Sequence, residues 1–270
     1  MKLITTTVGF LLDLYRSRLI LFELSKRDLK QRYLGSYLGI FWAFAQPLIF
    51  MLILYFIVSS GLRGPKSMQG LPFGVYLVSG LIAWRYFAEN LNQSSSAILV
   101  HRYLVKKANF RLSILPIVKL WSSLVPHLFL LAVAVVLAYI NGYSPTLYLL
   151  QVFYYLIAMI ALLLGIGWLT SSVSLFVADV RQLVSLIVQF GFWLTPLFWD
   201  PQGFPEKYRL ILKLNPMDYI VSGYRDALTG QSVFWDKPIE TVYFWSLVMM
   251  FMMLGITTYH RLRPHFAEVV

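Results

Sequence analysis

The sequence predicts an all-α integral membrane protein with six transmembrane helices. Of its 270 residues, 59% are hydrophobic and only 13% are charged, whereas soluble domains are about 45–50% apolar and about 25% charged. The apolar residues fall in blocks long enough for bilayer-spanning helices, which need roughly 20 residues each. This composition argues against an ordinary soluble enzyme and against a disordered chain. We therefore treat residues 1–270 as a single transmembrane domain.

Six apolar segments are expected to cross the membrane in turn. Pro47 lies inside the first and is expected to kink it, and the second carries two charges, Arg85 and Glu89. The next block has 59 uncharged residues, too many for one helix, and Asn-Gly-Tyr-Ser-Pro at 141–145 predicts a turn that makes it a helical hairpin. The six predicted spans cover residues 38–59, 72–92, 116–140, 147–176, 182–199 and 241–260.

The distribution of positive charge predicts that both termini are cytoplasmic. With the N-terminus inside, the inner segments carry 14 Lys and Arg residues and the outer segments carry 7. Cytoplasmic loops of membrane proteins carry such an excess. The net charge of +11 is thus explained by topology, and we expect contacts with membrane lipids and no nucleic-acid partner.

The segment 13–34 is too charged to span the membrane and is predicted to be an amphipathic helix in the cytoplasmic interface. Its apolar residues recur at roughly helical spacing: Leu19, Phe22, Leu29 and Tyr33. Its opposite charges stand four residues apart, as Glu23 with Arg27 and Asp28 with Arg32. Such spacing favours ion pairs along a helix. The alternative is a flank that merely sets the topology.

The inner loop 97–115 is basic but interleaved with apolar residues, which a solvated loop would not need. We expect a short helix there that docks into a partner; an ordinary positively charged loop is the alternative.

The outer segment 200–240 holds 11 charged residues in 41 and separates the fifth and sixth spans. Pro205 can open a helix, Asn215-Pro216 interrupts it, and a second helix is expected over about 217–229. These features predict a re-entrant pair of short helices in the outer leaflet.

The motifs of several enzyme classes are missing from the sequence. It contains no Gly-x-x-x-x-Gly-Lys-Ser/Thr loop, so the chain cannot hydrolyse ATP by that mechanism. Cysteine is absent, which excludes disulfides and thiolate metal sites. The histidines are far apart in sequence, at positions 101, 127, 260 and 265. We therefore expect no enzyme activity, no cofactor and no metal in this chain.

Several stretches, taken in order, resemble one family. They are Lys30–Tyr33 with Ser36–Leu48, Tyr76–Trp84, Tyr103–Phe110 with Leu115-Pro116, Phe176–Val180, Thr195-Pro196, Leu214–Pro216 and Arg225. Together they resemble the membrane permease of type-2 ABC exporters, in the branch that exports bacterial O-antigen, capsule and teichoic acid. Two features depart from the family pattern: Ala178-Asp179, where the family has Arg-Asp, and the charges Arg85 and Glu89, where it is neutral.

The resemblance implies a homodimer in the bacterial inner membrane with two copies of a separate ATPase subunit, which binds the ATP and magnesium. It also implies a channel at the dimer interface, lined partly by spans one and five. The implied substrate is a polysaccharide built in the cytoplasm on undecaprenyl pyrophosphate, with O-antigen the preferred reading. Two alternatives stay open: an exporter of a drug or small lipid, and a membrane enzyme acting on polyprenol-linked sugar.

Three groups of candidate site residues follow from this resemblance. Aromatic side chains on the two channel-lining spans could let sugar rings slide, or could simply pack in lipid or core: Trp42, Phe44, Phe190, Phe192, Trp193, Phe198 and Trp199. Cations near the inner surface could receive the pyrophosphate head group, or could anchor the chain to anionic lipid: Lys30, Arg32 and Arg181. Residues of the inner loop could couple to the ATPase: Tyr103, Lys106, Lys107 and Phe110.

The charges Arg85 and Glu89 stand one helical turn apart in the second span. A charge inside a span costs roughly 2.5–3.5 kcal/mol on insertion scales, and pairing lowers that cost. We therefore expect an intramembrane ion pair; direct contact of either residue with substrate is the alternative.

Overall fold

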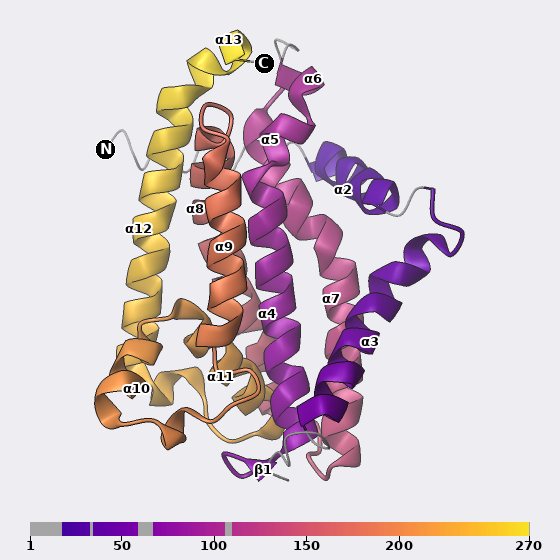
Figure 1. Cartoon of the computed structure of the whole chain (residues 1–270), viewed down its shortest axis with the longest axis vertical. Helices are drawn as coiled ribbons and strands as arrows, with labels where there is room; N and C mark the ends of the chain where they lie inside the picture. Colours follow the sequence, from indigo (N-terminus) through magenta and orange to yellow (C-terminus); the bar gives the residue numbers. More distant parts are fainter. Residues whose placement is uncertain (1–17, 33–34, 59–66, 106–109, 270) are drawn as a thin grey trace.

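The computed structural model is a bundle of long helices and describes residues 18–32, 35–58, 67–105 and 110–269 (Figure 1). The longer helices are α2 (Arg18–Arg32), α3 (Trp42–Phe56), α4 (Phe73–Ser95), α7 (Leu115–Ile140), α8 (Gln151–Val173), α9 (Asp179–Leu194), α11 (Pro216–Thr229) and α12 (Pro238–Leu262). The short α-helices are α5 (Ala97–Val100), α6 (Arg102–Val105), α10 (Glu206–Lys213) and α13 (Phe266–Val269). Short 3-10 turns cover Gly39–Phe41, Leu112–Ile114, Leu147–Leu150, Pro201–Gly203, Phe234–Asp236 and Arg263–His265.

Within the described residues, four helical stretches are long and apolar enough to cross a membrane. They are Gly39–Phe56, Leu112–Ile140, Leu147–Val173 and Pro238–Val269. These stretches make the chain an integral membrane protein. The two other predicted spans correspond to α4, which is long but carries charged and amide side chains along one side, and to α9, which has only 16 residues.

Helix α9 does not follow the predicted span 182–199 at either end. It starts earlier, at Asp179, and ends at Leu194. Thr195 has an extended backbone, with φ −90° and ψ 133°, because the residue before a proline is kept out of the helical region and Pro196 follows. The sequence prediction carried the helix through this proline.

A small hairpin, which was not expected in an all-α chain, precedes α4. Strands β1 (Ser67–Met68) and β2 (Leu71–Pro72) pair antiparallel. The two turn residues, Gln69 and Gly70, have φ values of 52° and 76°. Two positive φ angles suit a two-residue turn between twisted strands. Strands of two residues are too short to give an alternating sequence pattern.

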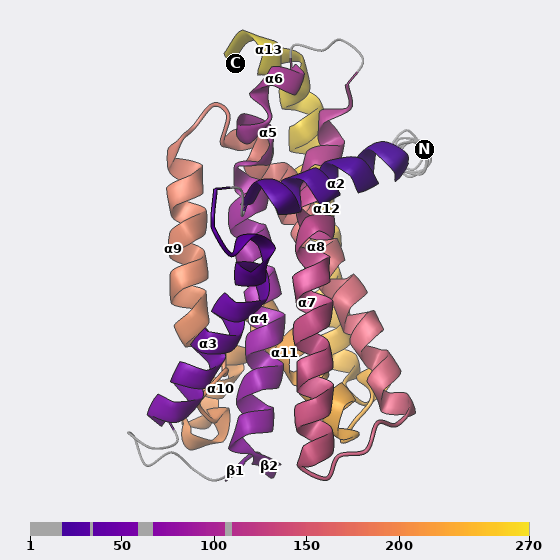
Figure 2. The same cartoon turned by 90° about the vertical axis from the view of Figure 1, so that its right-hand side faces the viewer.

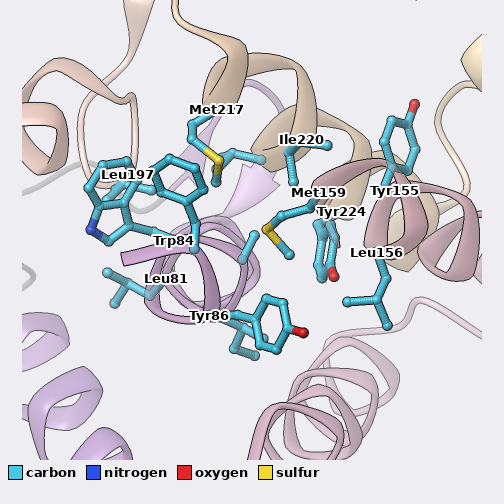
Figure 3. Packing of buried hydrophobic residues seen from close by; sticks show 14 of the residues in the cluster. Leu81, Trp84, Tyr86, Tyr155, Leu156, Met159, Leu197, Met217, Ile220 and Tyr224 are labelled. Carbon is cyan, nitrogen blue, oxygen red and sulfur yellow. The ribbon is translucent and has the colours of Figure 1, made fainter. Parts of the chain in front are cut away.

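Helix α4 lies at the centre of the bundle, between α7, α8, α9 and α11 (Figures 1 and 2). Figure 3 shows Tyr86 of α4 on the side of Met159 of α8 and Tyr224 of α11, and Trp84 of α4 on the other side, beside Leu197. Sixteen of its 23 residues are buried. This packing explains how a helix with polar residues keeps a fixed place in the molecule.

Two glycines allow α8 and α12 to pack backbone against backbone. A Cβ atom on Gly165 would lie 2.7 Å from the main chain of α12 at Met252, and one on Gly255 would lie 2.2 Å from the carbonyl oxygen of Gly165. No larger residue fits at either position without moving the helices apart. Gly165 is therefore a packing residue.

Helix α2 lies across the bundle and not along it (Figure 2). Its buried side presents Leu21, Ser25 and Asp28, which face α7. Leu19 and Phe22, two members of the predicted apolar stripe, are 76% and 66% exposed. These two residues point away from the protein, Leu29 is half-buried, and Tyr33 lies outside the described residues. The buried side of the helix carries a carboxylate.

Helices α10 and α11 lie at the end of the bundle opposite to the described C-terminal residues (Figure 1). Asn215 caps α11 by accepting a hydrogen bond from the amide of Met217 at 3.0 Å. Arg225 of α11 is only 4% exposed, and its Nη2 donates to the carbonyl oxygen of Pro196 at 2.6 Å. Its guanidinium stacks 3.4 Å from the ring centre of Tyr76 in α4. Arg225 therefore ties the segment after α9 to both α4 and α11.

Candidate functional site

A cavity of about 470 Å³ lies between α3, α4 and α9, beside the C-terminal end of α2. Helix α4 lines it with Leu81, Trp84, Arg85, Ala88, Glu89, Asn92 and Gln93. The other helices add Arg32 of α2, Gln46, Phe50 and Met51 of α3, and Phe192 of α9. Along α4, apolar residues line the part nearer the hairpin, and the acidic and amide groups line the part nearer α5. The cavity is therefore apolar at one end and charged at the other.

Arg32, the last residue of α2, joins three helices at the charged end of the cavity. Its Nε and Nη2 donate to Oδ2 of Asp28 at 3.1 and 2.7 Å. Its Nη1 donates to Oε1 of Glu89 in α4 at 2.6 Å, and Nη2 also donates to Oγ of Ser122 in α7. Hydrogen bonds between charged partners are the strong class in proteins. The predicted head-group cation Arg32 is thus held by two carboxylates of its own chain.

Asp28 is the buried centre of this network, with a side chain 5% exposed. It accepts hydrogen bonds from Arg32, from Nζ of Lys119 and from Oγ of Ser122, the last at 2.7 Å. Burial on its own raises the pKa of this carboxyl, but the charges of Arg32 and Lys119 and the donated hydrogen bonds outweigh it. The pKa of Asp28 therefore lies below its ordinary value, and the carboxylate stays charged at neutral pH.

The predicted ion pair between Arg85 and Glu89 is wrong. In the described part of the chain, Glu89 pairs with Arg32 and accepts a hydrogen bond from Nε2 of Gln93 at 3.0 Å. The cause is that the C-terminal end of α2 places the guanidinium of Arg32 beside α4, where it binds the carboxylate of Glu89 in place of Arg85. Arg85 lines the cavity and makes no hydrogen bond or ion pair with another described side chain.

Four of the candidate aromatic residues gather around the C-terminal end of α9. The ring centres of Phe192, Trp193 and Phe198 lie 5.5–5.7 Å apart in pairs. Trp199 donates its indole N–H to the carbonyl oxygen of Trp193 at 3.1 Å. Phe192 also reaches Phe50 of α3, with ring centres 6.4 Å apart. This cluster connects α9 to the apolar end of the cavity.

The other three aromatic candidates lie elsewhere. Trp42 is at the start of α3 and is 39% exposed. Phe44 packs edge-on against Phe129 of α7, with ring centres 4.8 Å apart, so it faces the bundle. Phe190 is 62% exposed on α9. In a single copy of the chain, the seven residues do not share one surface.

The inner loop keeps part of its apolar content for its own chain. Ile98 and Leu104 are buried, at 0% and 6% exposed, and Phe110 packs against the same cluster. Ile98 and Leu104 therefore pack within this chain, where α5 contacts α7 and α8, and are not open to a partner. Docking of the loop on a partner stays a prediction.

Among the described residues of the inner loop, Val100, Arg102, Tyr103 and Arg111 are exposed. Tyr103 and Val100 are 53% and 59% exposed, and they flank the buried His101. Lys106 and Lys107 lie outside the described residues. Tyr103 is thus the predicted coupling residue that the described structure places at the surface.

The two other predicted cations stand at helix ends. Lys30 is exposed near the end of α2, and Arg181 is half-buried in the first turn of α9. Neither lines the cavity.

Comparison with known proteins identifies the family. A family model described as the ABC-2 type transporter matches residues 21–229, which include every residue that lines the cavity. The chain belongs to the ABC-2 type transporter family. As an ABC-2 membrane subunit it is a transport component that works with an ATPase partner, and it is not itself an enzyme.

Curated relatives match this ABC-2 chain over most of its length. An O-antigen export system permease protein RfbA of Klebsiella pneumoniae is 27% identical over 264 residues, 97% of both chains. The RfbA permease of Myxococcus xanthus is 25% identical over 260 residues, 96% of this chain and 98% of its own. The polysialic acid transport protein KpsM of Escherichia coli is 23% identical over 235 residues, 85% of this chain and 89% of its own.

Sequence reasoning missed Lys119 as a member of the charge network. Lys119 sits in the predicted span 116–140 and is only 7% exposed. A lone lysine near the end of a span normally reads as reaching toward the interface. Only the fold shows that Asp28, 91 residues away in sequence, is its partner.

Proposed function

We propose that this chain is the permease of an ABC exporter that moves undecaprenyl-pyrophosphate-linked O-antigen polysaccharide from the cytoplasm to the periplasm. The observation that carries the proposal is the end-to-end match to permeases named for O-antigen export, which cover 97% of both chains. The match to polysialic acid transport proteins is weaker and shorter. A lipid-anchored polysaccharide fits both groups, and O-antigen fits the nearer one.

We propose that the chain crosses the membrane six times, with α4 and α9 added to the four long apolar stretches. Helix α4 has 23 residues and runs the length of the bundle, so it is proposed to cross as well. Helix α9 crosses as a short span, and α10 and α11, with 8 and 14 residues, are too short to cross. They form a re-entrant outer gate, which leaves both termini on the cytoplasmic side of the inner membrane.

Two copies of the chain are proposed to form the channel, with α3 and α9 of each copy at the interface. Helix α9 buries only Val184 within the chain, and the charged side of α4 opens between α3 and α9. A lipid-facing position for those charges would be costly. A second copy would cover them and bring the aromatic cluster of α9 against its counterpart.

The energy is proposed to come from two ATPase subunits that bind ATP and magnesium and dock on the inner loop. Tyr103 supports this assignment because it is exposed, together with Val100, in a loop whose Ile98 and Leu104 are buried. Lys106, Lys107 and Phe110 are proposed to complete the contact. Lys30 and Arg181 are proposed to attract the anionic head group at the inner surface.

Deletion of the gene in its own host tests the proposal. We expect loss of surface O-antigen and accumulation of lipid-linked polysaccharide on the cytoplasmic side, both reversed by the wild-type gene. A strain that keeps its surface polysaccharide and instead becomes sensitive to a drug would contradict the proposal in favour of a small-molecule exporter.

A further inference from the structure

We propose that Arg85 is the centre of a phosphate-binding site in the cavity between α3, α4 and α9, and that this site takes the phosphate head group of a polyprenol-linked substrate. The inference deepens the proposed function and rests on it.

The first argument is the charge balance of the cavity wall. The wall itself carries two cations, Arg32 and Arg85, and one carboxylate, Glu89; behind the wall, Arg32 and Lys119 share the carboxylate of Asp28. The carboxylates are both taken by Arg32 and Lys119. Among the described residues, one positive charge, that of Arg85, is therefore left over in a place where an uncompensated charge is costly. A ligand anion would balance it.

The second argument is the hydrogen-bonding capacity that stands open in the cavity. Arg85 makes no hydrogen bond with another described side chain, and neither does Gln46 of α3, which lines the same cavity. A guanidinium offers five N–H donors in a planar fork that matches phosphate oxygens. An amide adds two more donors. These donors could replace the water that a phosphate loses when it leaves the aqueous surface.

The third argument is the shape and polarity of the cavity. A volume of about 470 Å³ is in the range of sites for one small ligand, roughly 300–1,000 Å³, and suits a head group and not a polymer. The polar wall lies toward α5 and the inner surface, and the apolar wall of Phe50, Met51 and Leu81 lies deeper. A lipid of the inner leaflet has the same order, with its head outward and its chain toward the bilayer centre.

The Arg32–Glu89 ion pair keeps the electrostatic potential at the proposed site positive. Glu89 stands one turn from Arg85 and would repel a phosphate if its charge were free. Because Arg32 neutralises it at 2.6 Å, the field at Arg85 remains positive. Arg32 is then a positioning residue for this site, while Arg85 makes the contact.

The test measures binding of radiolabelled undecaprenyl pyrophosphate to the permease–ATPase complex in nanodiscs. Arg85→Gln should raise the dissociation constant at least about tenfold, as expected for losing charged hydrogen bonds. Arg85→Lys should fall between Arg85→Gln and wild type, because it keeps the charge without the fork. The matched control is Arg261→Gln, at an exposed arginine on α12 away from the cavity, and it should bind like wild type.

Competition distinguishes the source of the phosphate. Undecaprenol, which has no phosphate, should not displace the label from the Arg85 site. Displacement by inorganic pyrophosphate alone, sensitive to Arg85→Gln, would support an anion site that needs no lipid chain. Equal affinity of Arg85→Gln and Arg261→Gln would overturn the inference, as would equal competition by undecaprenol.

A second variant, Arg85→Cys, distinguishes loss of the charge from misfolding of the Arg85→Gln protein. The chain contains no cysteine, so Arg85→Cys places a single thiol in it. Modification with aminoethyl methanethiosulfonate, which restores a cation, should recover binding, and the neutral methyl reagent should not; wild-type complex treated in the same way controls for thiols on the ATPase. Equal binding after both reagents would overturn the site. If wild type exports O-antigen while Arg85→Gln both exports and binds normally, the inference fails and the proposed function stands.

Discussion

At the scale of single residues, the charges beside the cavity have distinct partners: Arg32 links α2 to α4 and α7, and Lys119 pairs with Asp28. Arg32 had been expected to meet the substrate, and Arg85 to pair with Glu89. In the fold, Arg32 bonds to Asp28 and Glu89 at 2.7 and 2.6 Å, and Arg85 faces a cavity. The i,i+4 pairing of Asp28 with Arg32 was visible in the sequence. The contacts to Glu89 and Lys119 were not, because they join helices far apart along the chain.

Asp28→Asn is predicted to destabilise the protein. The change leaves Arg32 and Lys119 without their shared charge partner, and breaking a buried ion pair costs about 3–5 kcal/mol. We expect a lower unfolding temperature in detergent than for wild type. The control is Glu23→Gln, on an exposed position of the same helix. Equal unfolding temperatures for the two variants would contradict the role of Asp28 as the anchor of α2.

The same carboxylate predicts a dependence on pH. Because the pKa of Asp28 is lower in the folded protein than its ordinary value of 3.8, its contribution is complete above that value. The contribution is lost as the pH falls through the lower folded pKa. In acid titrations, wild type should therefore lose stability in a range where Asp28→Asn, which has no carboxylate there, changes less.

A double-mutant cycle tests which arginine pairs with Glu89. Arg32→Gln and Glu89→Gln should be coupled, by about 0.5–3 kcal/mol as for residues in one network. Arg85→Gln and Glu89→Gln are expected to show a smaller coupling, because no hydrogen bond or ion pair joins them in the described structure. The measurement is thermal unfolding of the single and double variants in detergent. A larger coupling for Arg85 than for Arg32 would restore the pair expected from the sequence.

At the scale of elements, the lengths of the apolar segments predicted where most helices lie. They did not predict which helices pack together or where each helix ends. The ranges predicted from hydropathy overlap α3, α4, α7, α8, α9 and α12, because long apolar blocks leave few other conformations in a membrane. The end of α9 differed because Pro196 acts on the residue before it. The buried side of α2 was not predicted, because Asp28 and its charge network face α7 while Leu19 and Phe22 of the predicted apolar stripe are exposed. Burial of Ile98 and Leu104 depends on packing against residues far away in the sequence, which the local hydrophobic pattern cannot predict.

The inner loop carries a functional prediction at this scale. Tyr103→Ala should leave the permease folded and inserted, because the ring is exposed, but should reduce recovery of the ATPase in co-purification and reduce export. Trp235→Ala, at an aromatic residue 65% exposed near the other end of the bundle, is the control and should leave ATPase recovery unchanged. Full recovery of the ATPase with Tyr103→Ala would remove this residue from the contact.

At the scale of the whole molecule, a single copy leaves the charged side of α4 open between α3 and α9. The proposed dimer closes it, and the absence of native cysteines makes the arrangement measurable. Ile187→Cys in α9, at a side chain 53% exposed, should cross-link two copies in membranes. Met249→Cys in α12 is 55% exposed and should not, because α12 is expected to face lipid. Cross-linking through α12 alone would place the dimer interface on the other side of the bundle.

The most direct test of the account is transport by the purified complex. The permease and its ATPase are reconstituted in vesicles with lipid-linked O-antigen polysaccharide on the ATPase side, and polymer protected from an added glycosidase is measured with and without ATP. The account predicts protected polymer that requires ATP, the permease and an intact lipid pyrophosphate. Polymer that remains fully digestible while the complex hydrolyses ATP and moves a small molecule would contradict it.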